Sequence, residues 1–376
     1  MNYRYFLEVL TPVHIFSHHP EPWEVVADGD RLLVLEEAKL ARLLVGRGLR
    51  RQWCREVTSR GSIQRFLATH GMWAEVESCT KRTIVCPQGA QEAPRRIALT
   101  MSTGAPEEVY VPGSTVKGSI RTALLFRLLK DNPDLASRVR ESAEQKMQQA
   151  GSRRQRRQLA KTIGKETDQL LQHAALPGAR SEGPHTDWMR LLRVGDASPQ
   201  RAGQHTQAYQ VGVLSLRRDG RRATGYRTRT TFWVEAMRPG TVLEGRLIFD
   251  EDLLRWFEPR RGLRPLRSVE DVLVALQLFS AEVLEAQCRW YRQIGLADIA
   301  GQLERLRGRA NIRLGRGGGW DGRTVGLVFP EQFRRQIRDT FYRQRGPAPF
   351  SKSRQVLLRN NRPSTVLGWA RLSLER

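Results

Sequence analysis

Histidines near the N-terminus are the residues of this chain best suited to acid–base chemistry. His14 follows the alternating segment YRYFLEVL (3–10), and His18 and His19 come shortly after it. A histidine can act as a general base near pH 7, as metal-independent ribonucleases require. The spacing indicates neither a Ser-His-Asp set nor a histidine pair. His14 is therefore a candidate catalytic base, with a structural or RNA-contacting role as the alternative.

Acidic residues offer weaker candidates for catalysis. Asp196 closes the segment LRVGDASP (192–199), where an aspartate usually serves as a turn or cap residue. Asp250, Glu251 and Asp252 could together hold a divalent ion, but they stand where a helix is expected to begin. The solvated first turn of that helix accounts better for three acidic residues.

Cysteines give little support for a metal site. Cys79 and Cys86, with His70 nearby, are spaced more widely than the usual C-x2–4-C pair of a zinc site, and no second pair follows. Buried or half-buried thiols are the alternative. We expect neither a metal nor a cofactor.

A first glycine motif, PGSTVKGS (112–119), lies between a short apolar stretch and a helix. Its glycines have the spacing of a P-loop, but Lys117 precedes the second glycine, so nucleotide hydrolysis is excluded. A helix start offers free N–H groups and a partial positive charge, which suit a backbone phosphate. The alternative is an ordinary helix that Ser114 caps, with flanking cations. The candidate residues for this phosphate site are Gly113, Ser114, Lys117, Gly118 and Arg121.

A second glycine motif, LGRGGGWDGR (314–323), precedes a segment that alternates like a strand. A dinucleotide-binding fingerprint needs a helix there, so that site is excluded. Clustered glycines let the main chain approach another molecule closely. Trp320 could stack on a base or pack in the core. The residues of this loop expected to approach another molecule are Gly315, Arg316, Gly317, Gly318, Gly319 and Arg323, and the two arginines supply positive charge.

The elements that must position these motifs follow a recognisable order. We expect a strand at 3–10, a helix at 114–130, strands within 189–249 that include a hairpin at 229–249, a helix at 268–293 and a strand at 323–329. This β-α-β-β-α-β order predicts an α+β, ferredoxin-like (RRM-like) core with large insertions. The sheet of that fold commonly binds RNA.

Four segments follow from this order. Residues 1–130 form the first half of the core, with an irregular insertion at about 50–108. Residues 131–185 form a polar, basic helical insertion that contains SRRQRRQ (152–158), which either contacts RNA or is a solvated helix face. Residues 186–330 complete the core, and residues 331–376 add a C-terminal helix and strand.

The charge of the chain indicates a polyanionic partner. The 376 residues carry a formal net charge of +24, and all but eight of the 63 basic residues are arginines. Arginine suits bidentate contact with phosphate and stacking on bases. A high-GC genome or growth at high temperature would also enrich arginine, but would not by itself unbalance the charge so far. Hydrophobic residues make up 40% of the chain, enough for a substantial core.

The same composition predicts a cytoplasmic protein without membrane contact. The sequence has no apolar run of about 18 residues, and its N-terminus alternates instead of forming a signal peptide. Four cysteines are too sparse for a disulfide framework in a chain of this length.

The pairing of the two glycine motifs resembles the RAMP superfamily of CRISPR effector subunits. Within it, the chain is similar to the type III-A (Csm) subunit that caps the 3′ end of the guide RNA. The family usually continues its HI dipeptide with a Gly-Ser-Gly turn, whereas this chain has HIFSHHP (14–20). The matching segments, in the family's order, are FLEVLTPVHI (6–15), VPGSTVKGSIRTALLFRLL (111–129), LRVGDASP (192–199), FWVEAMRPGTVLEGRLIFD (232–250) and RLGRGGGWDGRTVGLVF (313–329).

The resemblance implies a non-catalytic subunit that binds CRISPR RNA (crRNA), caps its 3′ end, and supports guide maturation and assembly. The residues then expected to bind the RNA are Gly113, Ser114, Lys117, Gly118 and Arg121 of the first motif and Gly315, Arg316, Gly317, Gly318, Gly319 and Arg323 of the second. Its implied partners are the guide RNA, the adjacent backbone RAMP subunit and other Csm subunits, with target RNA and guide-trimming host nucleases as further candidates. The alternative is a RAMP-type endoribonuclease that processes the CRISPR precursor transcript, with His14 as its general base. A third possibility is an assembly scaffold whose charge serves solubility.

Overall fold

The computed structural model describes residues 1–59, 63–87, 93, 97–104, 107–177, 181–219, 222–259, 262–342 and 353–376. Its α-helices are α1 (Glu37–Gly46), α2 (Arg50–Thr58), α3 (Ile63–Thr69), α4 (Trp73–Ser78), α5 (Gly113–Asp131), α6 (Pro133–Gln148), α7 (Arg153–Asp168), α8 (Glu251–Trp256), α9 (Val269–Gln293), α10 (Ala297–Glu304) and α11 (Glu331–Tyr342). Its strands are β1 (Asn2–Val9), β2 (Val25–Asp28), β3 (Arg31–Leu35), β4 (Thr80–Val85), β5 (Ile97–Ala98), β6 (Ser102–Thr103), β7 (Glu108–Val109), β8 (Ala174–Ala175), β9 (Leu192–Val194), β10 (Ser198–Pro199), β11 (Thr206–Asp219), β12 (Arg222–Met237), β13 (Val242–Phe249), β14 (Glu258–Pro259), β15 (Ile312–Arg313), β16 (Ser353–Arg359), β17 (Arg362–Thr365) and β18 (Trp369–Glu375).

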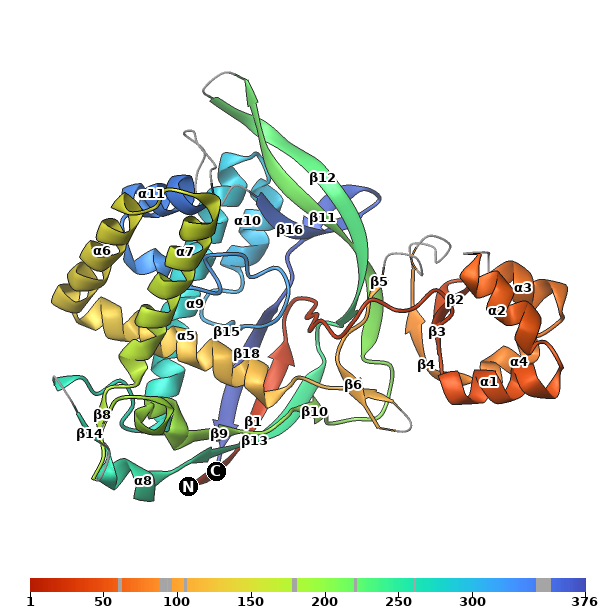
Figure 1. The fold of residues 1–376 in the computed structure, drawn as a ribbon, viewed down its shortest axis with the longest axis horizontal. Helices are drawn as coiled ribbons and strands as arrows, with labels where there is room; N and C mark the ends of the chain where they lie inside the picture. Colours follow the sequence, from red (N-terminus) through yellow and green to blue (C-terminus); the bar gives the residue numbers. More distant parts are fainter. Residues whose placement is uncertain are drawn as a thin grey trace.

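One antiparallel sheet, which we call sheet A, has β1 near its centre. Its strand order is β10-β13-β1-β18-β15, and β9 also pairs with β13. Leu7 lies opposite Leu243 on one side and Leu372 on the other. Side chains of β1 alternate between buried and more exposed positions, as the period-two pattern of 3–10 predicts. The two chain termini lie side by side at one end of this sheet (Figure 1).

The buried face of β1 shares one hydrophobic core with helices α5 and α9, which also pack on each other (Figure 1). Ile120 and Leu124 of α5 and Leu276 and Val283 of α9 belong to this core. Their spacing of four or seven residues puts each pair on one helix face. The α+β class expected from the sequence is therefore confirmed, and helix 268–293 is present with Ser268 at its N-terminal cap.

A second sheet, sheet B, has the order β17-β16-β11-β4-β3-β2, with β12 on β11. The hairpin expected at 229–249 is wrong, because β12 pairs with β11 while β13 lies in sheet A. Arg238 and Gly240 instead carry the chain from one sheet to the other, and Gly240 donates its N–H to the carbonyl of Val9. The β11–β12 hairpin extends beyond the other strands of sheet B (Figure 1).

The expected irregular insertion at about 50–108 is largely regular. Helices α1–α4 pack on β2 and β3 around their own apolar cluster, which includes Trp53, Phe66 and Leu67. The unit lies to one side of the rest of the chain (Figure 1). The short helix expected from Glu36 to Leu44 is confirmed as α1, whereas α2, α3 and α4 were missed because each spans only about two turns.

The strand expected at 323–329 is also wrong. Those residues form turns and a short 3-10 helix, Gly326–Val328, and alternation over so short a run does not distinguish these forms. The last strands of sheet A come instead from β15 and from β18 in the C-terminal tail. The tail is thus part of the sheet around β1, because β18 hydrogen-bonds directly to β1.

Close packing within sheet A predicts the effect of one substitution. Gly245 lies opposite Tyr5, and a Cβ at Gly245 would collide with the Tyr5 ring. Gly245→Ala should therefore lower the free energy of unfolding by about 1–3 kcal/mol. Urea unfolding followed by circular dichroism measures the change. Gly118→Ala is the matched control, since nothing lies within 4 Å of that Cβ, and it should stabilise the helix by about 0.5–1 kcal/mol. Equal effects of the two substitutions would contradict this packing.

Candidate nucleic-acid interface

The second glycine motif is a loop held by main-chain hydrogen bonds against the segment that follows β1. The N–H of Arg316 donates to the carbonyl of His14 at 3.0 Å, and that of Leu314 to the carbonyl of Gly368 at 2.8 Å. Gly315 has a φ of +61°, and a Cβ there would collide with the His14 carbonyl. Only glycine permits this close approach. We call residues 313–323 the glycine loop.

The first glycine motif begins α5, but its cap differs from the expected one. Ser114 is exposed and does not cap the helix, which begins at Gly113. The cap comes from Asp196, whose Oδ1 accepts the N–H of Gly113 at 2.7 Å. A Cβ on Gly113 would collide with the carbonyl of Val194. Gly113 therefore serves the contact between α5 and the segment 192–199, and Asp196 has a structural role.

The two cations of this motif are engaged within the protein. Lys117 Nζ donates to the carbonyl of Leu192 at 2.6 Å, and burial lowers the pKa of this lysine. Arg121 donates to Asp168 at 2.5 Å and forms an ion pair with Asp187 at 2.8 Å. Arg121 thus joins α5 to the end of α7 and to the segment before β9, and two carboxylates balance its charge.

The structure brings the two motifs together, although they lie far apart in the sequence. Ser119 Oγ in α5 donates to the carbonyl of Arg313, the first residue of the glycine loop, at 3.0 Å. Ser114 and Gly118 are exposed on the first turns of α5. The helix start and the loop therefore form neighbouring parts of one surface.

Arginines of the glycine loop supply positive charge at this surface. The Arg316 guanidinium lies 5.0 Å from the ring centre of Phe232 and 5.9 Å from that of Phe16. Arg323 is exposed and donates to the carbonyl of Gly315 at 2.8 Å, which closes the loop on itself. Stacking on the rings orients Arg316 without neutralising it. Trp320 is half-buried, with its ring against Gly326, and lines a cavity of about 320 Å³ beside α7 and α11.

His14 lies beside the glycine loop but has no exposed surface. Its Nδ1 is 2.7 Å from the carbonyl oxygen of Glu235, and its Nε2 is buried without a hydrogen-bond partner among the described residues. Burial lowers the pKa of His14 to about 4, and the nearby Arg316 acts in the same direction. In this position the ring is neutral at pH 7 and cannot reach a substrate.

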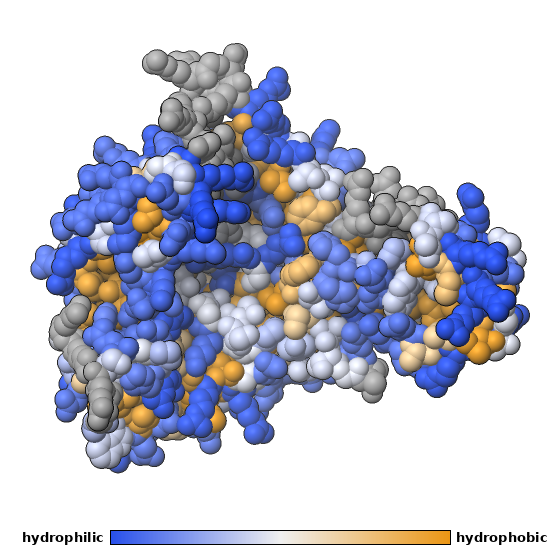
Figure 2. Space-filling view, viewed as in Figure 1, coloured by the Kyte–Doolittle hydropathy of each residue, from blue (hydrophilic) through white to orange (hydrophobic). Residues whose placement is uncertain are grey.

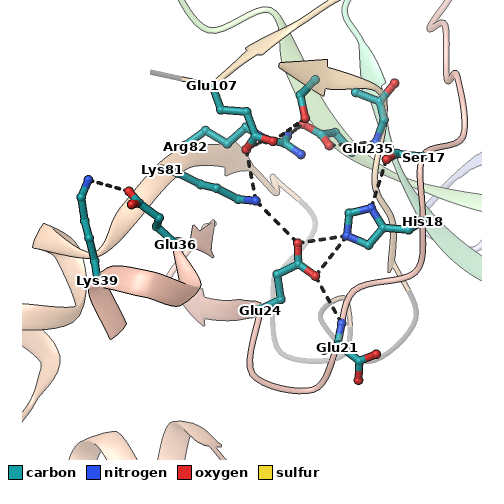
Figure 3. Close-up of polar contacts among 12 residues, drawn as sticks. Ser17, His18, Glu21, Glu24, Glu36, Lys39, Lys81, Arg82, Glu107 and Glu235 are labelled. Carbon is teal, nitrogen blue, oxygen red and sulfur yellow. Dashed lines mark hydrogen bonds and ion pairs between the residues drawn. The ribbon is translucent and has the colours of Figure 1, made fainter. Parts of the chain in front are cut away.

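His18 belongs to a chain of hydrogen bonds and ion pairs that fixes the segment after β1 (Figure 3). Its Nε2 lies 3.0 Å from Glu24, which also faces Lys81 at 3.7 Å. The chain continues through Glu107 to Arg82, which pairs with the fully buried Glu235 (Figure 3). These contacts join the segment between β1 and β2 to β4 and β12 of sheet B, and they give His18 a structural partner.

One basic surface was not predicted from the sequence. Arg227 and Arg229 of β12 are exposed, and both reach Ser215 of β11, at 3.3 and 3.0 Å. Arg217 is two residues from Ser215 and is exposed as well. The hairpin therefore carries arginines on one face. The RTRT run (227–230) indicates this arginine face in the sequence, because residues two apart in a strand share a face.

The remaining candidates have structural roles. Asp250 caps α8 through a hydrogen bond to the N–H of Leu253, as a solvated helix start predicts. The basic segment 152–158 begins α7, where Ser152 and Gln155 form a capping box, and no side chain of this helix is buried. Hydrophilic residues cover much of the face around α6 and α7 (Figure 2).

The described residues contain neither a metal-binding group nor a membrane-spanning helix. No group of three or more His, Cys, Asp or Glu side chains there could hold a metal ion. In the same part of the chain, no helix has the length and apolar character needed to cross a bilayer.

Comparisons with known proteins agree with this architecture. A family model described as RAMP superfamily matches residues 6–283. One similar structure is a chain of a Csm–crRNA–target RNA ternary complex of a type III-A CRISPR-Cas system, with a TM-score of 0.65, 21% identity and coverage of 99% of this chain and 100% of that one. Another is T. onnurineus Csm5, with a TM-score of 0.62, 19% identity and coverage of 97% and 99%. No curated protein matches. The family resemblance stated from the sequence is confirmed.

The burial of His14 predicts a pH dependence of stability. Its pKa in the folded protein, about 4, lies below the usual 6.5, so the unfolded chain binds more protons between these values. The associated stability is present above pH 6.5 and is lost as the pH falls toward 4. Between pH 7 and pH 5 this loss amounts to about 2 kcal/mol.

Denaturant unfolding at a series of pH values measures this effect. In His14→Asn the amide can still donate to the Glu235 carbonyl, and about 2 kcal/mol of the wild-type pH dependence should disappear. His185→Asn, at an exposed histidine, should keep the wild-type dependence. An unchanged dependence in His14→Asn would show that this ring is not buried in its neutral form.

Proposed function

Because the chain belongs to the RAMP superfamily, we propose that it is a crRNA-binding subunit of a type III-A CRISPR effector ribonucleoprotein. In this proposal the chain caps the 3′ end of the guide and supports crRNA maturation and assembly. Similarity over 97% of the chain to T. onnurineus Csm5, and over 99% to a chain of a Csm–crRNA–target RNA complex, supports this assignment.

The observation that carries the proposal is the juxtaposition of the two glycine motifs. The start of α5 and the glycine loop adjoin at Ser119 and Arg313, and Arg316 and Arg323 lie on the loop. Exposed main chain and uncompensated guanidinium groups suit the phosphates of a single RNA strand. In this assignment Ser114, Gly118 and the loop residues 315–319 contact the RNA backbone. Lys117 and Arg121 act by positioning α5.

The order of strands and helices supports a ferredoxin-like core in the proposed subunit. Along the chain, β1 is followed by α5, the segment of β9 and β10, β13, α9 and finally β18. In sheet A these strands lie in the order β18-β1-β13-β9, all antiparallel. The first strand thus lies between the third and the fourth, as a split βαβ arrangement requires. In this assignment β15 is an additional edge strand.

The proposed partners beyond the guide are the adjacent backbone RAMP subunit and other Csm subunits. Target RNA and nucleases that trim the guide are further candidates. The arginine face of the β11–β12 hairpin, which belongs to sheet B, offers a second cationic surface for nucleic acid. The proposed site of action is the cytoplasm.

We propose that the subunit is not catalytic. The competing assignment, a RAMP-type endoribonuclease with His14 as base, gains no support from the position of this side chain. A general base must lie within hydrogen-bond reach of the proton it removes, and His14 is fully buried.

The loop arginines give the direct test of RNA binding. The double substitution Arg316→Gln with Arg323→Gln should weaken binding of a single-stranded guide RNA about tenfold or more. It should also reduce the slope of log K against log salt by about 1.4, since each phosphate contact contributes about 0.7. Fluorescence anisotropy at several salt concentrations measures both quantities.

A matched control removes two exposed cations elsewhere. Arg255→Gln in α8 with Arg309→Gln after α10 removes the same charge from side chains that are 80% and 63% exposed. This variant should keep the wild-type slope. If both double variants lose affinity equally, the binding reflects overall charge, and the proposed contact at the glycine loop is wrong.

A further inference from the structure

Side chains of the glycine loop, α11 and β16 form a cluster of buried and half-buried arginines beneath the loop backbone. Arg313, Arg334 and Arg354 surround Asp321, and we call these four residues the arginine cluster. Arg354 Nη2 donates to Asp321 Oδ2 at 2.5 Å, and Arg334 Nη1 lies 4.0 Å from Asp321 Oδ1. Arg313 is 8% exposed, Arg354 7% and Asp321 1%. Three guanidinium groups and one carboxylate leave an excess of two positive charges.

Several N–H donors of the cluster have no hydrogen-bond partner within the described part of the chain. They are the Nε and Nη1 atoms of Arg313, Nε of Arg334 and Nε of Arg354. A buried donor without an acceptor costs about 1–3 kcal/mol, and a buried charge costs more. Burial lowers the pKa of Arg313 to about 9, with Arg354 and Arg323 acting in the same direction. The group is still cationic at neutral pH.

Neighbouring groups hold these guanidinium groups in place without neutralising them. Arg313 lies 4.9 Å from the ring centre of Trp369, and Arg354 lies 5.2 Å from that of Trp290. Arg313 Nη2 donates to the carbonyl of Gly317 at 2.5 Å. Stacked, fixed guanidinium groups are pre-organised for a planar set of acceptors.

The cover of the cluster is the glycine loop itself. A Cβ on Gly317 would lie 3.2 Å from Arg313 Nη2, and one on Gly322 would lie 3.0 Å from Arg313 Cδ. No side chain can therefore stand between the loop backbone and the Arg313 guanidinium. The glycines also give the loop the backbone freedom to admit a small group.

The charge and the donors of the cluster together select a class of ligand. A phosphate monoester carries about −1.5 to −2 charge at pH 7 and has three strong acceptor oxygens. A phosphodiester has a single charge and two such oxygens. A buried phosphodiester would also need room for the nucleic-acid strand to enter and to leave the site. The buried site, with its excess charge of two and several open donors, fits the monoester.

We propose that the arginine cluster beneath the glycine loop binds a phosphate monoester. The inference rests on the proposed function in identifying this group as the 3′-terminal phosphate of an RNA. Inorganic phosphate carries the same charge and acceptor oxygens. The experiment must therefore distinguish inorganic phosphate from an RNA 3′-phosphate as the ligand.

The experiment uses the full chain and otherwise identical single-stranded RNAs with a 3′-phosphate, a 3′-hydroxyl, or a 5′-phosphate and a 3′-hydroxyl. The 3′-phosphate RNA should bind about tenfold more tightly than the other two, the effect of one added charge-assisted contact. Equal affinity for all three would overturn the assignment of the cluster to an RNA terminus while leaving the proposed function intact. Equal gains from 5′- and 3′-phosphates would overturn the 3′-end assignment.

Inorganic phosphate forms a separate arm that needs no RNA. Phosphate should raise the midpoint of thermal unfolding above that in chloride of equal ionic strength. This measurement tests phosphate binding even if the chain binds no RNA. Such a failure to bind RNA would overturn the proposed function but not phosphate binding by the cluster. Phosphate protection without any preference for 3′-phosphate RNA would assign the cluster to free phosphate and overturn the RNA part of the inference.

Two substitutions with opposite expected effects identify the site. Arg313→Gln should abolish the preference for the 3′-phosphate, whereas Asp321→Asn removes the competing carboxylate and should keep or increase it. Arg371→Gln, an exposed residue of β18, is the control for charge and should leave the preference unchanged. If Arg313→Gln does not fold, the Asp321→Asn variant provides the test. A loss of the preference for 3′-phosphate RNA in Asp321→Asn would overturn the inference.

Discussion

The rest of the site depends on one close main-chain contact, between the segment after β1 and the glycine loop. The carbonyl of His14 accepts the N–H of Arg316, and the carbonyl of Pro12 accepts that of Gly368. Both contacts leave no room for side chains, because a Cβ on Gly315 would collide with the His14 carbonyl and one on Gly368 would lie 2.6 Å from the Leu314 carbonyl. This contact fixes where β15, β18 and Arg316 lie relative to β1.

Two buried charge networks in the chain illustrate opposite solutions to the cost of desolvation. In the network around Glu235, carboxylates of Glu24, Glu107 and Glu235 face Lys81 and Arg82, and hydrogen bonds satisfy the fully buried Glu235. A network whose carboxylates are all paired with cations or hydrogen-bonded suits a structural joint. The arginine cluster has excess positive charge and open donors, an imbalance that an anion would relieve.

The sequence predicted those elements whose pattern was long or strongly periodic. Helix 268–293 and strand 3–10 were correct because apolar residues recur along them at one period. The strand at 323–329 was wrong because a run of that length alternates by chance as easily as by structure. The hairpin at 229–249 was wrong because Arg238-Pro239-Gly240 indicates a turn, whereas the choice of partner strand depends on distant residues.

Residue types and local spacing alone therefore determined the α+β class, the basic character and the presence of two glycine motifs, since each is a property of neighbouring residues. Tertiary structure decided which of these groups is available to a ligand. In the folded chain His14 is buried, and Arg121 forms ion pairs with two carboxylates. Asp196, and not Ser114, caps α5. The fold also gathers Arg313, Arg334 and Arg354 around one aspartate. Burial and charge balance arise from residues far apart in the chain, and so only the fold specifies them.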